Sequence, residues 1–181
     1  YGSDKGIFGF GWTGSNVGVT NLVSNVGVVA DDVAAVGTAR HAPGACEYGN
    51  DKGIFAYGVA GDYLATSNPV SNAGVVASDV TGVGTPRYYI TACSYGEDKG
   101  IFGYGKKTGA VNVSMTNKVS NVGVVADDTT GVGTARFYLA ACEYGQDKAI
   151  FGFGDTGSVL DEINLVSNTG VVASDTTGVG T

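Results

Sequence analysis

Residues 135–154 read ARFYLAACEYGQDKAIFGFG, and this stretch predicts a β-hairpin. The side chains of its first half alternate between two faces with a period of two residues, which predicts a β-strand. One face carries Arg136, Tyr138, Ala140, Cys142 and Tyr144. The letters GQDK at 145–148 predict the turn, because Gly and Asp adopt the backbone conformations that tight hairpins need. AIFGFG at 149–154 predicts the returning strand, with Phe151 and Phe153 on one face.

The hairpin is one copy of a repeat that fills the chain of 181 residues. Its Asp-Lys dipeptide begins at Asp4, Asp51, Asp98 and Asp147, at intervals of 47, 47 and 49 residues. A Ser-Asn dipeptide begins at Ser24, Ser71, Ser120 and Ser167. The sequence therefore predicts a single repeat domain over 1–181, with units at 1–47, 48–94, 95–143 and 144–181.

Each unit predicts four short strands and no helix. In the last unit, EINLVSN at 162–168 predicts a third strand and TGVVAS at 169–174 a fourth, before the turn-rich DTTGVGT. All-β units of this length with Gly-rich turns favour a β-propeller, whose neighbouring blades bury each other's aromatic and valine faces. A β-solenoid is the competing arrangement, although its rungs are normally shorter.

The letters RFYLAACEYG followed by KAIFGFG resemble the kelch repeat, with an Arg-led inner strand, a turn, and an apolar strand ending in Gly. The near-identical units are similar to kelch-like arrays of phage and environmental bacterial surface proteins. The resemblance implies an all-β fold, a β-propeller built from four kelch-like four-stranded repeats, or an open portion of a larger propeller or array. It also implies a binding or scaffold role, as in most members of the family, of which few are enzymes. We expect this chain to be no enzyme and to lie outside the cell or on a virion or cell surface.

The last unit is shorter than the others, because it lacks a segment that corresponds to ARFYLAACE at 135–143. Such a segment would be the inner strand that leads into Tyr1. An unpaired place in a sheet exposes backbone donors and acceptors and invites a strand from elsewhere. Three interpretations stay open: a piece of a longer array, undefined residues before Tyr1, or a strand from a neighbouring molecule. We expect the chain to pack against copies of itself or to belong to a larger assembly.

Composition limits the possible partners. The formal net charge of −7 argues against binding to nucleic acid, because an acidic surface repels phosphates. No apolar run approaches the roughly 20 residues that a membrane span requires. Hydrophobic residues make up 43% of the chain, which is enough for a packed core.

The sequence contains no recognisable catalytic constellation, phosphate-binding loop or dinucleotide fingerprint, so we expect no catalytic residues, no cofactor and no metal. The single histidine, His41, is expected to be structural or exposed. The cysteines occur once per unit and are expected to be small core residues, too far apart for a disulfide or a metal site; they are Cys46, Cys93 and Cys142.

Two further sets of charged residues repeat along the chain. The first precedes each Gly-rich turn, where each carboxylate is expected to cap its own turn, with calcium binding as the alternative: Asp32, Asp79, Asp128 and Asp175. The second combines the Asp-Lys turns with three arginines and predicts repeated ion pairs that link the units: Arg40, Arg87 and Arg136.

One segment differs from unit to unit, and repeat proteins often place such variation on a binding face. The candidate binding residues there are Trp12, Tyr63, Lys106, Lys107 and Met115. The alternative is neutral drift in exposed loops. A carbohydrate-binding, lectin-like propeller is the second functional hypothesis, in which a Trp or Tyr of each blade stacks on a sugar.

Overall fold

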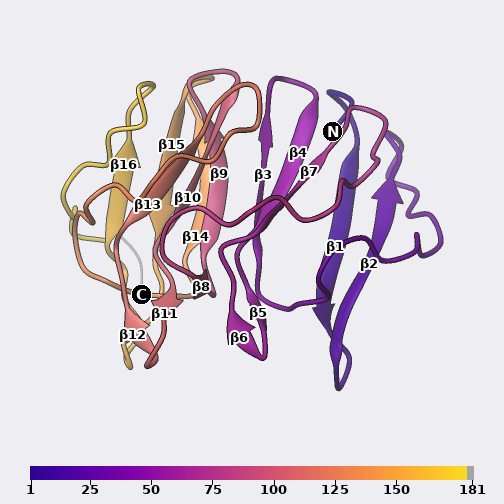
Figure 1. The fold of residues 1–181 in the computed structure, drawn as a ribbon. Coiled ribbons are helices and arrows are strands. Elements are labelled where there is room, and N and C mark those ends of the chain that lie inside the picture. The colour runs from indigo at the N-terminus through magenta and orange to yellow at the C-terminus, as the bar shows by residue number, and fades with distance from the viewer. Residues whose placement is uncertain (179–181) are drawn as a thin grey trace.

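The computed structural model describes residues 1–178, and every regular element in this range is a β-strand (Figure 1). Consequently, no helix in the described part of the chain is long and apolar enough to cross a membrane. The fold class is all-β, as the sequence predicts. All ladders between the strands are antiparallel.

Four sheets contain the hairpins of the repeat. The first sheet has two strands, β1 (Gly6–Trp12) and β2 (Asn16–Val23). The other three have three strands each, in the orders β3 (Gly44–Tyr48), β4 (Lys52–Ala56), β7 (Ser67–Val70); β9 (Thr91–Tyr95), β10 (Lys99–Gly103), β13 (Thr116–Val119); and β14 (Ala140–Tyr144), β15 (Lys148–Gly152), β16 (Ile163–Val166).

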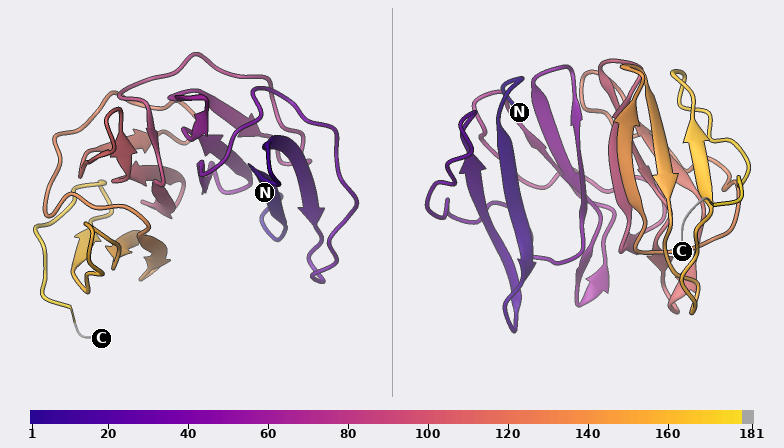
Figure 2. Two further views of the ribbon diagram at one scale, coloured as in Figure 1. Left: turned by 90° about the horizontal axis from the view of Figure 1, so that it is seen from below. Right: turned by 180° about the vertical axis from the view of Figure 1, so that it is seen from behind.

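Short strands extend these sheets at one end. They form a two-stranded sheet of β5 (Val59–Ala60) and β6 (Asp62–Tyr63), and a three-stranded sheet of β12 (Val111–Asn112), β11 (Lys106–Lys107) and β8 (Arg87–Tyr88). The sheets follow one another along an open arc, with β1 and β2 at one end and β14, β15 and β16 at the other (Figure 2). We call the exposed sides of these two end sheets the N-terminal face and the C-terminal face.

The predicted strands are longer than the observed ones. Residues 135–145 were expected to form one strand, but β14 begins only at Ala140, because Tyr138 has a φ of 56°. A left-handed residue interrupts the alternation of side chains, so the predicted common face of Arg136 and Tyr138 is wrong: Arg136 is fully buried and Tyr138 is exposed.

The returning strand and the fourth strand also differ from the prediction. Phe153 has a φ of 63°, which ends β15 and turns its ring away from that of Phe151. Phe151 is fully buried whereas Phe153 is exposed, so their predicted common face is wrong. The segment 169–174 forms no continuous strand; it contacts β16 through the isolated bridge between Val172 and Val166.

The apolar core lies between neighbouring sheets. One buried cluster joins Phe55, Val70 and Val76 to Ile7 and Phe10 of the first sheet. The second joins β3 and β4 to β10 and β13, and the third joins β9 and β10 to β15 and β16. Because a single sheet is one layer thick, its apolar side chains leave water only when the next sheet covers them.

The three cysteines show the effect of position along the arc. All are free; Cys93 is buried, Cys46 is partly buried and Cys142 is exposed. The prediction of a small core residue is therefore wrong for Cys142. This residue lies on β14 of the end sheet, where no further sheet of the described chain covers it.

Candidate functional site

Each boundary between neighbouring sheets holds one buried arginine. Arg40, Arg87 and Arg136 have no exposed surface. The guanidinium of each lies over an aromatic ring of the preceding sheet: 4.1 Å above Phe10, 4.8 Å above Tyr57 and 4.7 Å above Tyr104, respectively. Buried guanidinium groups need a full set of acceptors, because burying an unpaired charge costs several kcal/mol.

The following sheet supplies several of these acceptors, while the Nε atoms of Arg40 and Arg87 have no hydrogen-bond partner in residues 1–178. Arg87 donates to the carbonyl oxygens of Tyr104 at 3.3 Å and Met115 at 2.8 Å, and to the side-chain oxygen of Asn117. Arg40 and Arg136 donate to Asn68 and Asn164 at 2.6 and 2.7 Å. Burial lowers the pKa of Arg40 to about 10, while the nearby Asp79 carboxylate opposes this shift. Each arginine thus joins an aromatic ring of one sheet to an asparagine of the next.

A threonine and an aspartate reinforce each arginine boundary. The Thr38 backbone N–H and hydroxyl donate to Asp79 Oδ2 at 2.9 and 2.6 Å, across 41 residues. Thr85 and Thr134 bind Asp128 and Asp175 in the same way. The prediction that these aspartates cap their own turns is therefore wrong, because the donors come from the preceding unit. Asp32 is bound only by Asn21, at 2.8 Å, within the described chain.

The predicted ion pairs divide into two kinds. Arg40 and Asp79 lie 3.7 Å apart and Arg136 and Asp175 3.5 Å apart, so these pairs link neighbouring sheets. The Asp-Lys pairs instead form between adjacent residues of one turn, as in Asp98 and Lys99 at 2.7 Å. Asp98 also accepts a hydrogen bond from Asn121. These turn pairs are therefore local.

The aromatic rings of consecutive sheets interlock at the same boundaries. Phe55 meets Phe10 edge to face with a centroid distance of 5.2 Å, and Phe102 and Phe151 meet Tyr57 and Tyr104 at 5.5 and 5.3 Å. A Cβ atom added to Gly103 would lie only 2.9 Å from the ring of Phe151. The small residue therefore makes room for the incoming ring.

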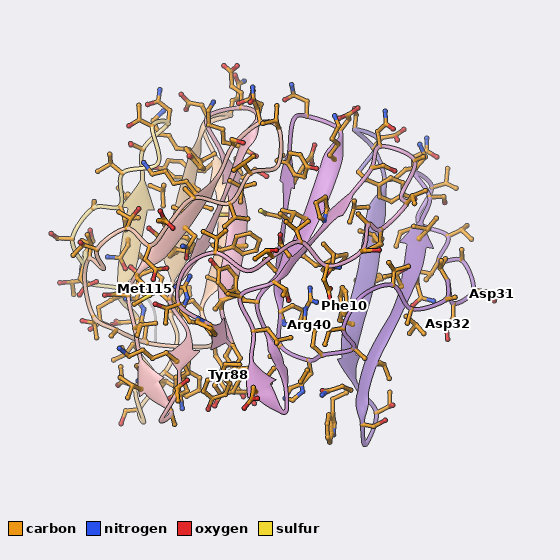
Figure 3. The ribbon with its side chains drawn as sticks, viewed as in Figure 1. Phe10, Asp31, Asp32, Arg40, Tyr88 and Met115 are labelled. Carbon is orange, nitrogen blue, oxygen red and sulfur yellow. The ribbon has the colours of Figure 1, made fainter. Side chains whose placement is uncertain are left out.

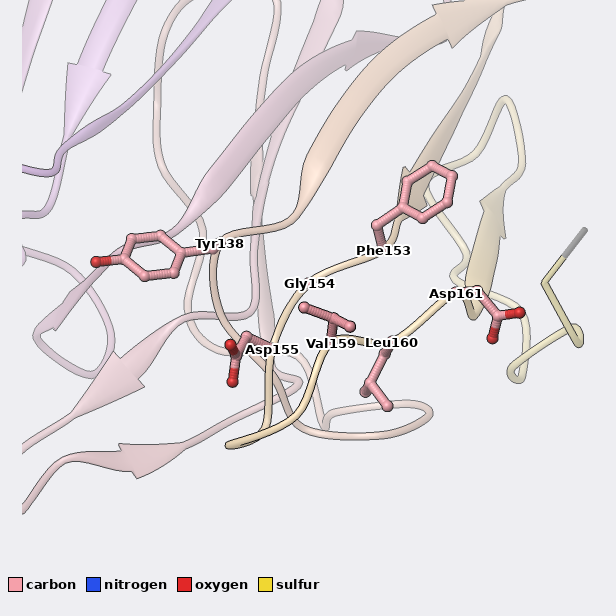
Figure 4. A pocket seen from close by; sticks show the side chains of 7 residues that line it. All are labelled: Tyr138, Phe153, Gly154, Asp155, Val159, Leu160 and Asp161. Carbon is pink, nitrogen blue, oxygen red and sulfur yellow. The ribbon is translucent and has the colours of Figure 1, made fainter. Parts of the chain in front are cut away.

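Phe8, at the corresponding position of the first sheet, is 65% exposed, and the ring of Phe153 at the other end of the arc is 51% exposed. Beside Phe153 lies a cavity of about 640 Å³, which is lined also by Tyr138, Leu160, Asp155 and Asp161 (Figure 4). The two ends of the arc thus expose the groups that are buried at each internal boundary.

No family model matches this sequence, and no curated protein matches it either. In residues 1–178 no group of three or more His, Cys, Asp or Glu side chains could hold a metal ion.

The candidate binding residues from the sequence lie in two separate places. Trp12 is 60% exposed and meets the ring of His41 at 5.1 Å, while His41 itself is hydrogen-bonded to Asn16. Tyr63 stacks on Tyr88 at 4.7 Å. The structure therefore does not bring Trp12 and Tyr63 together.

The remaining candidates have structural contacts. The Lys106 ammonium lies 3.6 Å from the ring centroid of Phe137. Lys107 pairs with Arg87 and Val111 in the small sheet of β8, β11 and β12. Met115 contributes its backbone carbonyl to Arg87, so its contact does not depend on the side chain.

A row of aromatic rings was not predicted as a site. Tyr88 contacts Tyr89, and Tyr89 contacts Tyr138, each at 4.3 Å. With Tyr63 and Phe137 they form the aromatic row, which joins two neighbouring units. A hydrogen bond with Tyr89 and burial raise the pKa of Tyr138 to about 12. The Tyr or Phe that follows two of the three arginines (Tyr88, Phe137) was a signal in the sequence, but the neighbours of these rings across units were not.

Proposed function

We propose that this chain is a non-catalytic structural and interaction repeat module that packs against copies of itself in an extracellular, virion or appendage assembly. In this proposal its sheets are kelch-like blades of a β-propeller, or of an open portion of a larger array. The observation that carries the proposal is the exposure of Phe8, because its counterparts Phe55, Phe102 and Phe151 are all buried against a preceding sheet.

The two end faces are complementary in their apolar groups. At the internal boundaries, a ring such as Phe151 packs on the preceding Tyr104 and Gly103. The N-terminal face offers the exposed Phe8, and the C-terminal face offers the exposed Phe153 beside Gly152, where an added Cβ would meet only Ile163. A second copy could therefore place Phe8 where the internal boundaries place their rings.

The polar groups of the two faces match as well. The Gly2, Gly49 and Gly96 amides each donate at 2.7 Å to the Asp carbonyl of the following sheet, namely Asp51, Asp98 and Asp147. Within the described chain the Gly145 amide makes no such bond, and neither does the Asp4 carbonyl. At the last internal boundary Tyr95 packs on Gly170. The corresponding groups of the end faces lack this contact: Tyr144 of the C-terminal face is 39% exposed, and Gly27 of the first unit has no atom within 4 Å of its Cβ position.

Such an interface is head-to-tail, because the two faces differ. Head-to-tail contacts produce rings when the rotation closes and filaments when it does not. Covering one exposed phenylalanine contributes roughly 2 kcal/mol. That is a useful share of an association whose affinity also depends on the surrounding hydrogen bonds.

Sedimentation velocity over a range of concentrations tests the proposal, with electron microscopy of concentrated material to reveal filaments or rings. We expect Phe8→Ala to weaken assembly roughly thirtyfold, as for a loss of about 2 kcal/mol, without lowering thermal stability, because the ring is already exposed. Val111→Ala is the matched control: Val111 is 49% exposed but lies on β12, away from the end faces. A chain that stays monomeric at all concentrations, or that assembles equally well with Phe8→Ala, contradicts the proposal.

The second candidate function is carbohydrate binding, and the aromatic row favours it. Tyr138 is 59% exposed and continues the row through Tyr89 and Tyr88 to Tyr63. Sugars stack on the faces of such rings. A glycan array tests this function: binding that Tyr138→Ala removes supports it, and an array without any binding contradicts it.

A further inference from the structure

The first sheet has an open edge that the other three sheets fill. β4, β10 and β15 each pair with a strand on both sides. Within residues 1–178, β1 pairs only with β2, so its other edge presents backbone groups that no strand in this range pairs with. Tyr1 already exchanges hydrogen bonds with Lys5, so the open edge begins at Gly6.

Across β1 from this edge, Asn21 of β2 forms a polar pair with Asp32 that is built like the arginine sites. The Asn21 side-chain amide donates to Asp32 Oδ1 at 2.8 Å and to the Ala30 carbonyl at 3.2 Å. In the occupied sites the corresponding bonds from Asn68 measure 2.9 Å to Asp79 and 3.0 Å to Ala77. The geometry of the pair is thus formed before any arginine is present.

The free atoms of this pair are those that bind arginine and threonine elsewhere. Asn68 Oδ1 accepts from Arg40, and Asp79 Oδ2 accepts from Thr38. Within residues 1–178, Asn21 Oδ1 and Asp32 Oδ2 accept no hydrogen bond from a side chain. Figure 3 shows Asp32 at the N-terminal end of the arc, far from Arg40, which occupies the next site.

We infer that the N-terminal face is a binding site for an extended peptide segment with the pattern Thr-x-Arg, followed after three residues by a short strand. The three internal segments that begin at Thr38, Thr85 and Thr134 are examples of this ligand, bound by the same chain. The peptide threonine donates to Asp32, and its arginine donates to Asn21. This inference rests on the proposed function, because it names the segment that completes the N-terminal face of that interface.

The register of the bound strand follows from the last sheet. There Ala140 lies opposite Gly152, and Glu143 lies opposite Ala149. Gly9 and Gly6 occupy the corresponding positions of β1, so residues equivalent to 140–143 pair with Gly6–Gly9. Backbone hydrogen bonds give such an added strand its affinity, and the side-chain sites give it specificity.

Arginine is the specific element of the ligand. Its planar guanidinium donates in several fixed directions, which a lysine ammonium does not reproduce. The net charge of −7 favours the positive charge of the peptide arginine. A peptide that lacks arginine keeps the strand pairing but leaves the Asn21 oxygen unbound.

The test uses a synthetic peptide of residues 134–143, TARFYLAACE, with its Cys142 replaced by Ser. Titration calorimetry against the full chain, at a concentration where it is monomeric, is expected to show saturable one-to-one binding. Replacing the peptide arginine by Gln is expected to weaken binding at least about tenfold, as for a lost charge-assisted hydrogen bond. Backbone N-methylation of the ladder-facing amides is expected to weaken it as well.

Two matched variants of the chain locate the site. Asp32→Asn is expected to weaken binding about tenfold, because the threonine and the arginine both lose the carboxylate. Asp31→Asn removes the same charge from the adjacent residue, which makes no side-chain hydrogen bond in the described chain, and is expected to leave affinity within about twofold.

The inference is overturned if the peptide does not bind, or if binding is equally strong without the arginine and with Asp32→Asn. Failure of this inference and failure of the proposed function are distinguishable. A chain that assembles through Phe8 but does not bind the peptide contradicts only the inference. A chain that binds the peptide but stays monomeric contradicts only the proposed function.

Discussion

The substitution Arg87→Met tests whether the buried arginines hold neighbouring sheets together. Methionine has a similar length and packs well in a core, so the substitution removes the charge and the donors while leaving little empty space. In the native chain Arg87 is fully buried between Tyr57 of one sheet and Asn117 of the next.

The expected loss follows from the contacts of the guanidinium. The substitution removes three hydrogen bonds, to Tyr104, Met115 and Asn117, each with a net value of about 1 kcal/mol. It also removes the contact with the Tyr57 ring, which contributes about 1 kcal/mol. The apolar methionine recovers part of this, so we expect the free energy of unfolding to fall by about 3 kcal/mol.

Urea denaturation followed by circular dichroism measures the effect. For a slope of about 2 kcal/mol per molar urea, the loss corresponds to a midpoint about 1.5 M lower. The urea midpoint of Arg87→Lys is expected to lie between those of the native chain and Arg87→Met, because lysine keeps the charge but lacks the planar set of donors. Lys99→Met is the control, since Lys99 is 41% exposed and forms its ion pair within one turn. The reasoning is refuted if Arg87→Met lowers the midpoint no more than Lys99→Met does.

Three further outcomes are expected. Burial alone would raise the pKa of Asp128, but hydrogen bonds from Thr85 and Asn117 and the charge of Arg87 bring this pKa below its ordinary value. The unfolded chain therefore binds more protons at this site, and the free energy of unfolding should fall as the pH drops from about 4 through the folded pKa. Urea denaturation at a series of pH values measures this, and Asp128→Asn should reduce the pH dependence. A free energy of unfolding that does not change with pH in this range would contradict the prediction. Gly103→Ala should lower the free energy of unfolding by about 1–3 kcal/mol, because its Cβ would lie 2.9 Å from the buried Phe151 ring. Gly152→Ala at the C-terminal face is the control and should be tolerated. Equal melting temperatures of the two variants would argue against the interlocking of rings between sheets. Cys142 is exposed and should react with iodoacetamide in the folded chain. Burial raises the pKa of Cys93 to about 12, so this thiol should react only on unfolding. Peptide mapping by mass spectrometry distinguishes the two residues, and rapid labelling of Cys93 in the folded chain would contradict the fold.

The elements that depend on neighbouring residues could be predicted from the sequence. Alternation and the GQDK turn located the hairpin of β14 and β15, and the repeated Asp-Lys dipeptides gave its period. The sequence did not reveal the interruptions at Tyr138 and Phe153. Both are aromatic residues with positive φ, a conformation that their side chains do not favour in isolation.

The partners of the repeated polar residues depend on how the sheets pack in space. Arg40 reaches Asn68 across 28 residues, and Thr38 reaches Asp79 across 41, so no local pattern could pair them. This packing also makes equivalent residues differ: Phe8 is exposed and Phe151 is buried although both occupy the same place in their repeats. The physical reason is that burial depends on the next sheet along the arc, and each of the two end sheets has such a neighbour on one side only.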